Sequence, residues 1–277
     1  MELREKFNKL KENLKSMESV AVAFSGGVDS TFLLKVSQDV LGNRSIAVTA
    51  RSETFPEREY KEAVNFTKKH GIKHITIVSE ELEIEGFSDN PTDRCYFCKH
   101  ELFSKIIKSA KVENVRYVLD GSNVDDLSDY RPGLKAIEEL KISSPLKEAK
   151  LSKDDIRKLS KEMNLSTWNK PAFACLSSRF PYGQKITSKK LKMVDRAEEY
   201  LLKLGFKQVR VRHHGDIARI EVASNERSKF FNENVMEGVS NKLKEIGFLY
   251  TALDLKGYRT GSMNETLNLQ KKLFTSE

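Results

Sequence analysis

Apolar runs and amphipathic stretches alternate along the first half of the chain. Residues 20–24, Val-Ala-Val-Ala-Phe, form an apolar run that predicts a buried strand. After a glycine-rich turn, apolar side chains recur at helical spacing over residues 30–41, which predicts a helix. The same reading predicts further elements, in the order strand 45–49, helix 57–70, strand 75–78 and strand 115–119. Strands that alternate with helices favour a parallel sheet with helices on both faces.

The second half carries a different pattern. Residues 208–213 and 217–222 alternate between apolar and polar side chains, with Gly215 and Asp216 between them, which predicts a β-hairpin. Other elements are expected around this hairpin: a helix over 191–204, a helix in the later part of 230–246 and a strand over 248–255. Together they predict a small α+β fold.

An irregular stretch over residues 167–183, with three prolines or glycines, separates the two patterns. Just before it, Ser152 is expected to cap a helix that reaches Asn164, with Asp155 at the third helical position. We therefore expect two domains, residues 1–166 with the parallel sheet and residues 167–277 with the α+β fold.

The glycine-rich turn is the most informative motif. Residues 25–30 read Ser-Gly-Gly-Val-Asp-Ser and lie between the first strand and the first sheet helix. Backbone amides, two serine hydroxyls and a helix N-terminus would point at one spot, which is a cradle for a phosphate. The lysine of a Walker A loop is missing. The turn resembles the loop of the PP-loop ATP pyrophosphatases, which split ATP between the α- and β-phosphates. The alternative is a tight turn capped by Asp29 or Ser25.

A second turn is expected to join this site. The first strand ends at Phe24 and the fourth at Leu119, and ligands of such sheets bind beyond the carboxyl ends of the strands. The glycine-rich turn and Asp120-Gly121 should therefore share one crevice. Asp120 and Asp125 could bind ribose or Mg²⁺, although aspartate after a strand is often only a turn former.

Composition narrows the class of protein. The chain has 277 residues and a net charge of +8, with 48 basic residues interspersed among 40 acidic ones, so a lysine-rich surface is expected. No apolar run reaches the roughly 20 residues that span a bilayer. Residues 1–17 have helical spacing without the apolar core of a secretory signal. We expect a cytoplasmic protein with no membrane partner.

Three cysteines, Cys95, Cys98 and Cys175, suggest metal or redox chemistry. Residues 80–90 have no period and are interpreted as a loop leading to the first two, which form a C-x-x-C. A closed zinc site usually needs four ligands, and zinc with His100 or another histidine as the fourth is an alternative, although His100 lies too near Cys98 for the usual spacing without strain. Three thiolates suit a [4Fe–4S] cluster with one open iron. The alternative is that some or all are ordinary buried thiols.

Several longer blocks make the resemblance specific. The chain resembles the LarE family of PP-loop sulfur transferases over nearly its whole length. The blocks are Val22–Thr31, Leu119-Asp120-Gly121, residues 129–135 (Asp-Tyr-Arg-Pro-Gly-Leu-Lys), Trp168-Asn169-Lys170, residues 177–183 (Ser-Ser-Arg-Phe-Pro-Tyr-Gly), 209–212 (Val-Arg-Val-Arg) and 216–221 (Asp-Ile-Ala-Arg-Ile-Glu).

The resemblance implies a fold and a reaction. The fold would be of the PP-loop, adenine nucleotide α-hydrolase-like type, with a smaller C-terminal domain for substrate binding or oligomerisation. A carboxylate of pyridinium-3,5-biscarboxylic acid mononucleotide would be adenylated by ATP with Mg²⁺, and sulfur would then displace AMP. A second round would give the bisthiocarboxylic acid, a precursor of the nickel-pincer nucleotide cofactor. One branch sacrifices a cysteine, whereas another holds a [4Fe–4S] cluster on three cysteines, and this chain looks like the second branch.

The resemblance also assigns residues. The ATP site would comprise Ala23, Phe24, Ser25, Gly26, Gly27, Asp29, Ser30, Asp120, Gly121 and Asp125. Cys95, Cys98 and Cys175 would be catalytic and hold the cluster. Lys99 would contact substrate or AMP, unless it is a surface lysine. The mononucleotide would contact Ser178, Arg179, Arg210, Arg212 and Arg259. A sulfide donor and a homo-oligomer are expected.

Arg210 and Arg212 lie two apart on a predicted strand, so both face one side. Two guanidinium groups on one face can clamp a phosphate. Spacing alone favours a solvated strand face with Glu221 as an ion-pair partner, and the resemblance favours the phosphate site.

Three other functions compete with this reading. A transfer-RNA thiolase would also use three cysteines and a cluster, but the chain has no paired zinc C-x-x-C motifs and no separate RNA-binding module, so nucleic acid is not expected as a partner. A PP-loop amide ligase would not need the C-x-x-C. The non-enzymatic alternative is a nucleotide-binding regulatory module.

Overall fold

The computed structural model describes residues 2–128, 132–171, 174–259 and 261. The chain divides into two compact units, one of Met1–Phe87 and Thr92–Phe173 and the other of Ser88–Pro91 and Ala174–Glu277. Each unit has its own sheet. In the part of the chain that the structure describes, no helix is both long and apolar enough to cross a membrane.

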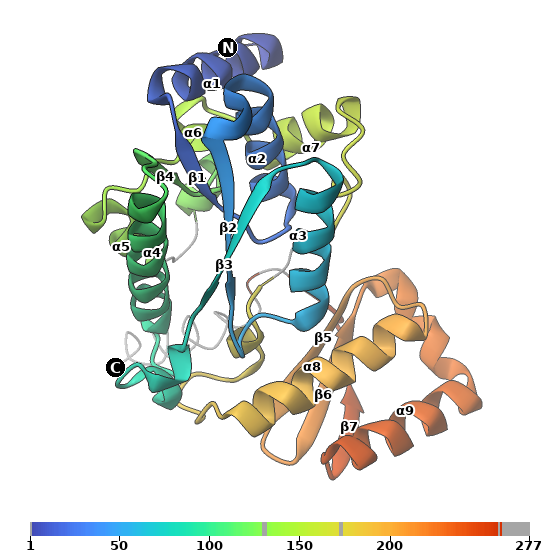
Figure 1. The fold of residues 1–277 in the computed structure, drawn as a ribbon. Helices are drawn as coiled ribbons and strands as arrows, with labels where there is room; N and C mark the ends of the chain where they lie inside the picture. Colours follow the sequence, from blue (N-terminus) through green and yellow to red (C-terminus); the bar gives the residue numbers. More distant parts are fainter. Residues whose placement is uncertain (1, 129–131, 172–173, 260, 262–277) are drawn as a thin grey trace, which may run out of the picture. The chain divides into compact units, whose positions relative to one another are not determined.

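The first unit contains a four-stranded parallel sheet in the order β3-β2-β1-β4 (Figure 1). Its strands are β1 (Val20–Ala23), β2 (Ser45–Arg51), β3 (Lys73–Val78) and β4 (Tyr117–Leu119). The predicted α/β class with a parallel sheet is confirmed. The sheet strands are those that the apolar runs predicted, although β2 continues further and β4 is shorter than expected.

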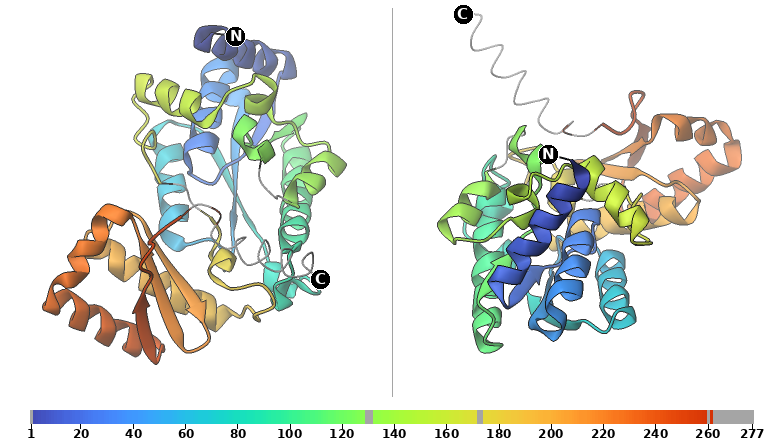
Figure 2. Two further views of the ribbon diagram at one scale, coloured as in Figure 1. Left: turned by 180° about the vertical axis from the view of Figure 1, so that it is seen from behind. Right: turned by 90° about the horizontal axis from the view of Figure 1, so that it is seen from above.

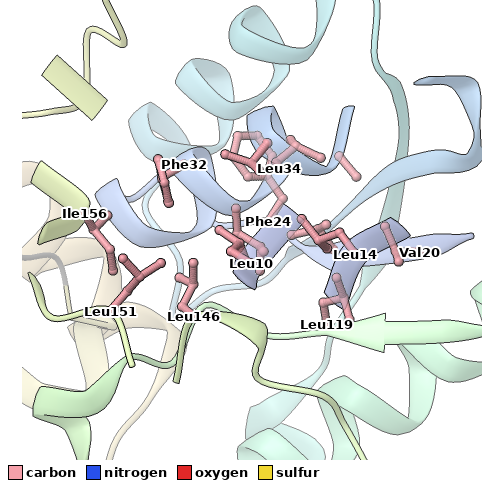
Figure 3. Packing of buried hydrophobic residues seen from close by; sticks show 14 of the residues in the cluster. Leu10, Leu14, Val20, Phe24, Phe32, Leu34, Leu119, Leu146, Leu151 and Ile156 are labelled. Carbon is pink, nitrogen blue, oxygen red and sulfur yellow. The ribbon is translucent and has the colours of Figure 1, made fainter. Parts of the chain in front are cut away.

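Helices cover both faces of this sheet, as the two further views in Figure 2 also show. The helices are α1 (Leu3–Met17), α2 (Val28–Leu41), α3 (Glu57–Lys69), α4 (Arg94–Val112), α5 (Gly133–Glu139), α6 (Pro145–Glu148) and α7 (Lys153–Glu162). On one face, Val20 and Val22 of β1 join a core with α1, α2, α6 and α7, which Figure 3 shows from close by. On the other face, Ala21 of β1 packs with Phe103 and Ile106 of α4. Successive strand side chains therefore enter opposite cores.

The strand order creates a switch point between β1 and β4. The chain leaves β1 through α2 to reach β2 on one side, whereas β4 pairs with the other edge of β1, at Val22↔Leu119. At such a point the connections diverge and leave a crevice beyond the carboxyl ends of the two strands. The glycine-rich turn follows β1 and Asp120-Gly121 follows β4.

The helix α4 was not predicted from the sequence. The buried apolar side chains of α4 all lie in its second half, at Phe103, Ile106 and Ala110. Its first half carries the C-x-x-C. The sequence therefore offers no helical apolar stripe where the cysteines lie. The segment before it contains two short 3₁₀ helices, Glu81–Glu83 and Phe87–Asp89, rather than one plain loop.

The second unit contains the three-stranded sheet β5-β6-β7. The strands are β5 (Val209–His214), β6 (Ile217–Val222) and β7 (Tyr250–Leu253), and the helices are α8 (Ser188–Lys203) and α9 (Glu233–Ile246). The predicted hairpin is confirmed, since β5 and β6 pair antiparallel around the turn at Gly215, whose φ is +64°. Val209, Val211 and Ile220 are buried with the helices, so the opposite face of the hairpin carries Arg210 and Arg212.

The boundary between the compact units falls after Phe173 rather than after residue 166. The reason is that α7 holds the next turn: Arg157 donates hydrogen bonds to the carbonyl oxygens of Trp168 (2.7 Å) and Lys170 (2.8 Å). The assignment of residues 1–166 and 167–277 to separate functions stays a prediction.

The capping box that the sequence predicted at α7 is present. The Ser152 hydroxyl accepts a hydrogen bond from the Asp155 N–H (3.2 Å), and the Asp155 carboxylate accepts one from the Ser152 N–H (3.1 Å). Lys6 of α1 also pairs with that carboxylate at 2.7 Å. Burial alone would raise the pKa of Asp155, but the bonds from Lys6 and Ser152 lower it below its ordinary value of 3.8.

We expect Asp155→Asn to lower the free energy of unfolding by about 1 kcal/mol at pH 7. A depressed pKa in the folded state contributes stability above the unfolded value, and that stability is lost as the pH falls below 3.8 toward the folded value. The difference from the wild type should therefore shrink between pH 5 and about pH 3 in urea unfolding. Asp154→Asn, an exposed neighbour, is the control and should change little. If Asp155→Asn lowered the free energy of unfolding equally at pH 5 and at about pH 3, the depressed pKa of Asp155 would not contribute to stability.

Candidate active site

The glycine-rich loop has the geometry of an anion cradle. Gly26 has a φ of +67°, a left-handed conformation that glycine adopts without strain. The Ser25 and Ser30 hydroxyl oxygens lie 3.1 Å apart, and the Ser25 N–H donates to the Ser30 hydroxyl at 3.3 Å. Helix α2 begins at Val28 with Gly27 as its N-cap and without a side-chain cap bond. The alternative that Asp29 or Ser25 serves as the N-cap is therefore wrong.

Residues of the neighbouring strands β2 and β3 hold the backbone just before the loop. The carbonyl oxygen of Phe24 accepts a hydrogen bond from the Thr49 hydroxyl (2.7 Å), and His74 Nε2 lies 2.8 Å from the same hydroxyl. Because the Thr49 hydroxyl donates to Phe24, a proton on His74 Nε2 would complete this chain of bonds. Burial lowers the pKa of His74, so a neutral imidazole with the proton on Nε2 fits this chain of bonds.

The turn after β4 lies directly against the start of α2. A Cβ on Gly121 would lie 3.2 Å from the Ser30 backbone nitrogen, which is tighter than ordinary packing. The two turns therefore meet, as expected from the strand ends. Their roles toward ATP stay predictions.

The carboxylates around the loop all have partners. Asp120 is 5% exposed and accepts hydrogen bonds from the hydroxyls of Ser122 and of Ser144, the latter at 2.6 Å. It therefore braces the turn in this arrangement. Asp29 forms an ion pair with Lys153 and accepts a bond from Asn123 at 3.4 Å. Asp125 accepts a bond from the Lys153 backbone N–H at 2.8 Å, so these carboxylates form one network with the start of α7.

Cys95 and Cys98 lie in the first turns of α4, three positions apart and thus on neighbouring parts of one helix face. All three cysteines of the chain are described as half-buried thiols, not disulfides. Cys98 Sγ lies 4.0 Å from a carboxylate oxygen of Glu81, whose pKa is raised by burial. The sequence analysis missed Glu81, since it falls in a segment without a period.

Lys99 is held against helix α5. A Cβ on Gly133 would lie 2.6 Å from Lys99 Cδ and 3.1 Å from the Cys95 carbonyl oxygen, so a larger residue there would displace the Lys99 side chain. The aliphatic part of the Lys99 side chain is therefore packed against α5, and Lys99 is less exposed than a surface lysine would be. Asp129, Tyr130 and Arg131 of the neighbouring sequence block lie outside the described residues.

Cys175 belongs to the second unit, at the N-cap of the 3₁₀ helix Leu176–Arg179. Its carbonyl oxygen accepts hydrogen bonds from the Ser178 hydroxyl (2.8 Å) and from Arg179 Nη1 (3.0 Å). The described residues contain no group of three His, Cys, Asp or Glu side chains placed to hold a metal ion. Joint ligation by the three cysteines stays a prediction.

Arg179 and Glu198 form a buried ion pair in the second unit. Their side chains are 0% and 1% exposed. Two parallel bonds, Nε to Oε1 at 2.8 Å and Nη2 to Oε2 at 2.9 Å, make the pair bidentate. Burial would lower the pKa of Arg179, but Glu198 foremost and then Cys175 raise it further, so its charge is fixed.

Glu221 orients arginines on the hairpin face that lies opposite Val209 and Val211. It accepts a bond from Arg212 at 2.8 Å and one from Arg219 at 2.9 Å, and Arg212 also donates to the Ser178 carbonyl at 2.7 Å. The ion pair that the alternative reading anticipated is therefore present. The face is not a solvated one, however, since Arg210 and Arg212 are each 7% exposed.

Arg210 lies over the ring of Tyr258 at 5.1 Å. Burial, and next the neighbouring Arg179, lower its pKa to about 10, so it stays a cation at neutral pH. Arg259 approaches Asp254 at 3.6 Å, and Arg219 approaches the same carboxylate at 3.8 Å. The described arginines of this cluster (Arg179, Arg210, Arg212, Arg219 and Arg259) exceed the carboxylates paired with them (Glu198, Glu221 and Asp254), which suits an anionic ligand.

Comparisons with known proteins agree with this geometry. Residues 2–99 match the NAD synthase family. The chain is 42% identical over 255 residues to the pyridinium-3,5-bisthiocarboxylic acid mononucleotide synthase of Lactiplantibacillus plantarum, with 92% of each chain covered. The chain belongs to the LarE family.

The chain is also similar to two uncharacterized proteins over most of their length. One, from Synechocystis sp., is 41% identical over 96% of this chain and 99% of its own. The other, from Methanocaldococcus jannaschii, is 32% identical over 92% of this chain and 98% of its own. The chain is thus a PP-loop enzyme of the LarE family, and its first unit has the NAD synthase-type fold.

Several residues of this LarE-family site were missed from the sequence. Glu198 offered a signal, because a glutamate in register with the buried Val194 and Leu201 of an amphipathic helix needs a buried partner. Tyr258 and Lys153 offered none, since their contacts with Arg210 and Asp29 join distant parts of the sequence.

Glu198→Gln should destabilise the second unit strongly, because it leaves Arg179 buried and uncompensated. We expect a loss of about 3–5 kcal/mol in the free energy of unfolding, measured by denaturant titration at pH 7. Glu199→Gln is the matched control: this neighbour pairs with Lys203 on the surface and should cost under about 1 kcal/mol. Similar losses in the two variants would show that the pair is not the stabilising element.

Proposed function

We propose that this chain catalyses ATP-dependent insertion of sulfur into pyridinium-3,5-biscarboxylic acid mononucleotide, giving the bisthiocarboxylic acid mononucleotide. The L. plantarum relative, named as the synthase of this product, supports the substrate. The observation that carries the proposal is the presence in one chain of a PP-loop at the β1/β4 switch point and a buried arginine face on a second unit. The first suits ATP, and the second suits a nucleotide phosphate.

The first step proposed is adenylation. A substrate carboxylate oxygen attacks the α-phosphorus of ATP, and pyrophosphate leaves with the electron pair of the broken P–O bond. The loop amides and the Ser25 and Ser30 hydroxyls, which lie together, would stabilise the charge on departing pyrophosphate. Mg²⁺ binds mainly phosphate oxygens and waters, so Asp29 is a sufficient protein ligand, whereas the buried Asp120 fits this role poorly.

The second step transfers sulfur. A sulfide attacks the acyl carbon, the bond to the AMP oxygen breaks, and a thiocarboxylate and AMP result. Cys95, Cys98 and Cys175 are the residues that would hold a [4Fe–4S] cluster: all are thiols, and two share a helix face. When bound, such a cluster supplies an iron open to external sulfide. The half-buried Lys99 beside Cys98 would contact the adenylate.

Arg210 and Arg212 are proposed to hold the mononucleotide phosphate. Their guanidinium groups face one side of β5 and are already oriented by Tyr258 and Glu221. Ser178, Arg179 and Arg259 would complete the pocket. A sulfide donor, a homo-oligomeric state and a cytoplasmic location complete the proposal.

Variants in the two units should separate the two binding functions. Asp29→Ala is expected to lower pyrophosphate release by about a hundredfold, because the loop network is lost at the reacting phosphates. Arg210→Met is expected to raise the KM for the mononucleotide about tenfold or more while the Kd for ATP is unchanged. A pyrophosphate assay measures the rate of release and the KM for the mononucleotide, and calorimetry measures the Kd for ATP.

Asp39→Ala, at the other end of α2, is the control. It should leave the rate of pyrophosphate release, the KM for the mononucleotide and the Kd for ATP at wild-type values. If Asp29→Ala released pyrophosphate at the wild-type rate, the PP-loop assignment would be wrong. If Arg210→Met weakened ATP instead of the mononucleotide, the assignment of the arginine face would be wrong.

The source of sulfur can be tested on anaerobically purified protein. We expect about four irons per chain, with a lower iron content and less sulfur transfer in each single Cys→Ala variant. With sulfide, ATP and substrate supplied, turnover should exceed one per chain, because no cysteine is consumed.

A mass loss of about 34 Da at Cys175, equal to H₂S, would instead identify that thiol as a sacrificial donor. Zinc at one ion per active chain, without iron, would refute the cluster.

A further inference from the structure

Lys170, the last residue of the Trp168-Asn169-Lys170 block, contacts the PP-loop itself. Its Nζ donates to the Gly26 carbonyl oxygen at 3.2 Å. The same Nζ pairs with Glu59 and with Glu62 of α3, each at 2.6 Å. None of the steps described above uses this lysine or these glutamates.

Helix α7 puts Lys170 in this place. The two bonds from Arg157 to the Trp168 and Lys170 carbonyls clamp the turn, which the Lys170 N–H closes by donating to the Thr167 carbonyl at 3.0 Å. Lys161 of α7 also lies over the Trp168 ring at 4.9 Å. The backbone on which the ammonium group is carried is therefore fixed.

The two glutamates lie where negative charge opposes phosphate binding. Helix α3 packs against the loop, since a Cβ on Gly26 would lie 3.5 Å from the Ala63 Cβ. Glu59 and Glu62 lie on the same part of α3 as Ala63, and the Glu59 side chain is only 9% exposed. Water therefore screens the charge of Glu59 poorly, whereas the Glu62 side chain is 59% exposed, so it is chiefly an uncompensated Glu59 that would repel a triphosphate in the loop.

The ammonium group compensates that charge. The Lys170 side chain is 16% exposed. Burial would lower the pKa of Lys170, but Glu59 first and then Glu62 raise it overall, so the residue is a cation at neutral pH. Its third bond, to Gly26, holds the carbonyl of the one loop residue in a left-handed conformation.

We propose that Lys170 is a positioning residue of the PP-loop, which cancels the charge of Glu59 and Glu62 beside the loop and fixes the Gly26 carbonyl so that the loop accepts the phosphates of ATP. This inference rests on the ATP use proposed above. It differs from direct contact of Lys170 with a phosphate, because its main effect passes through the two glutamates.

The test is titration of the full chain with MgATP by calorimetry. Lys170→Met should weaken ATP binding about tenfold, as expected for uncovering poorly screened like charges. The triple variant Lys170→Met/Glu59→Gln/Glu62→Gln removes the repelling charges together with the lysine, so its Kd should return to within about threefold of the wild type. Lys158→Met, which removes an exposed lysine of α7, should bind like the wild type.

Thermal unfolding of each variant separates binding from folding. Because the triple variant removes Lys170 together with both of its carboxylate partners, it remains informative even if Lys170→Met does not fold. Wild-type affinity in a folded Lys170→Met variant would overturn the inference. A triple variant that folds but binds ATP as weakly as Lys170→Met would also overturn it, in favour of direct phosphate contact. A wild-type chain that binds no ATP would refute the proposed function, and this inference with it.

Discussion

The divergence of the chain at β1 and β4 is the constraint on which the rest of the first unit depends. Because β4 pairs with the free edge of β1, the turns after these two strands meet with no strand between them. The start of α2 then has backbone N–H groups without helical partners at the point where the turns meet. Gly26 supplies the left-handed residue, and Gly121 allows close approach. The proposed phosphate site thus follows from topology and two glycines, before any charged side chain contributes.

Both units place ion pairs beside their proposed binding surfaces, and these pairs range from the fully buried Arg179–Glu198 to partly exposed ones such as Asp29–Lys153. Asp29 with Lys153, Lys170 with Glu59 and Glu62, and Arg179 with Glu198 each place opposite charges in contact. Buried pairs such as Arg179 with Glu198 contribute little net stability, since desolvation offsets the attraction, but breaking one is costly. They therefore fix geometry more than they stabilise the fold. Among the described residues, the arginine cluster of the second unit keeps more cations than paired carboxylates, where the proposed substrate phosphate would bind.

Local signals predicted most of the fold, and long-range contacts account for what was missed. The hairpin at Gly215 and the capping box at Ser152 depend on neighbours in the sequence, and both were predicted correctly. Helix α4 was missed because its cysteine-bearing half has no apolar stripe. The partners Lys170 and Glu59 are 111 positions apart, and no spacing rule joins them. The sequence therefore indicated which side chains carry chemistry better than how they are held.

The two proposed anion sites differ in a way that suits the reaction proposed. Pyrophosphate is released in each round, so a loop that binds it through backbone amides and hydroxyls, without the lysine of a Walker A motif, lets it leave. The substrate phosphate must be retained through both rounds of sulfur insertion. Arginine suits that task, since its planar guanidinium binds phosphate through two parallel hydrogen bonds and stays charged when buried. The ring of Tyr258 and the carboxylate of Glu221 orient Arg210 and Arg212 beforehand, which lowers the entropy lost when phosphate binds.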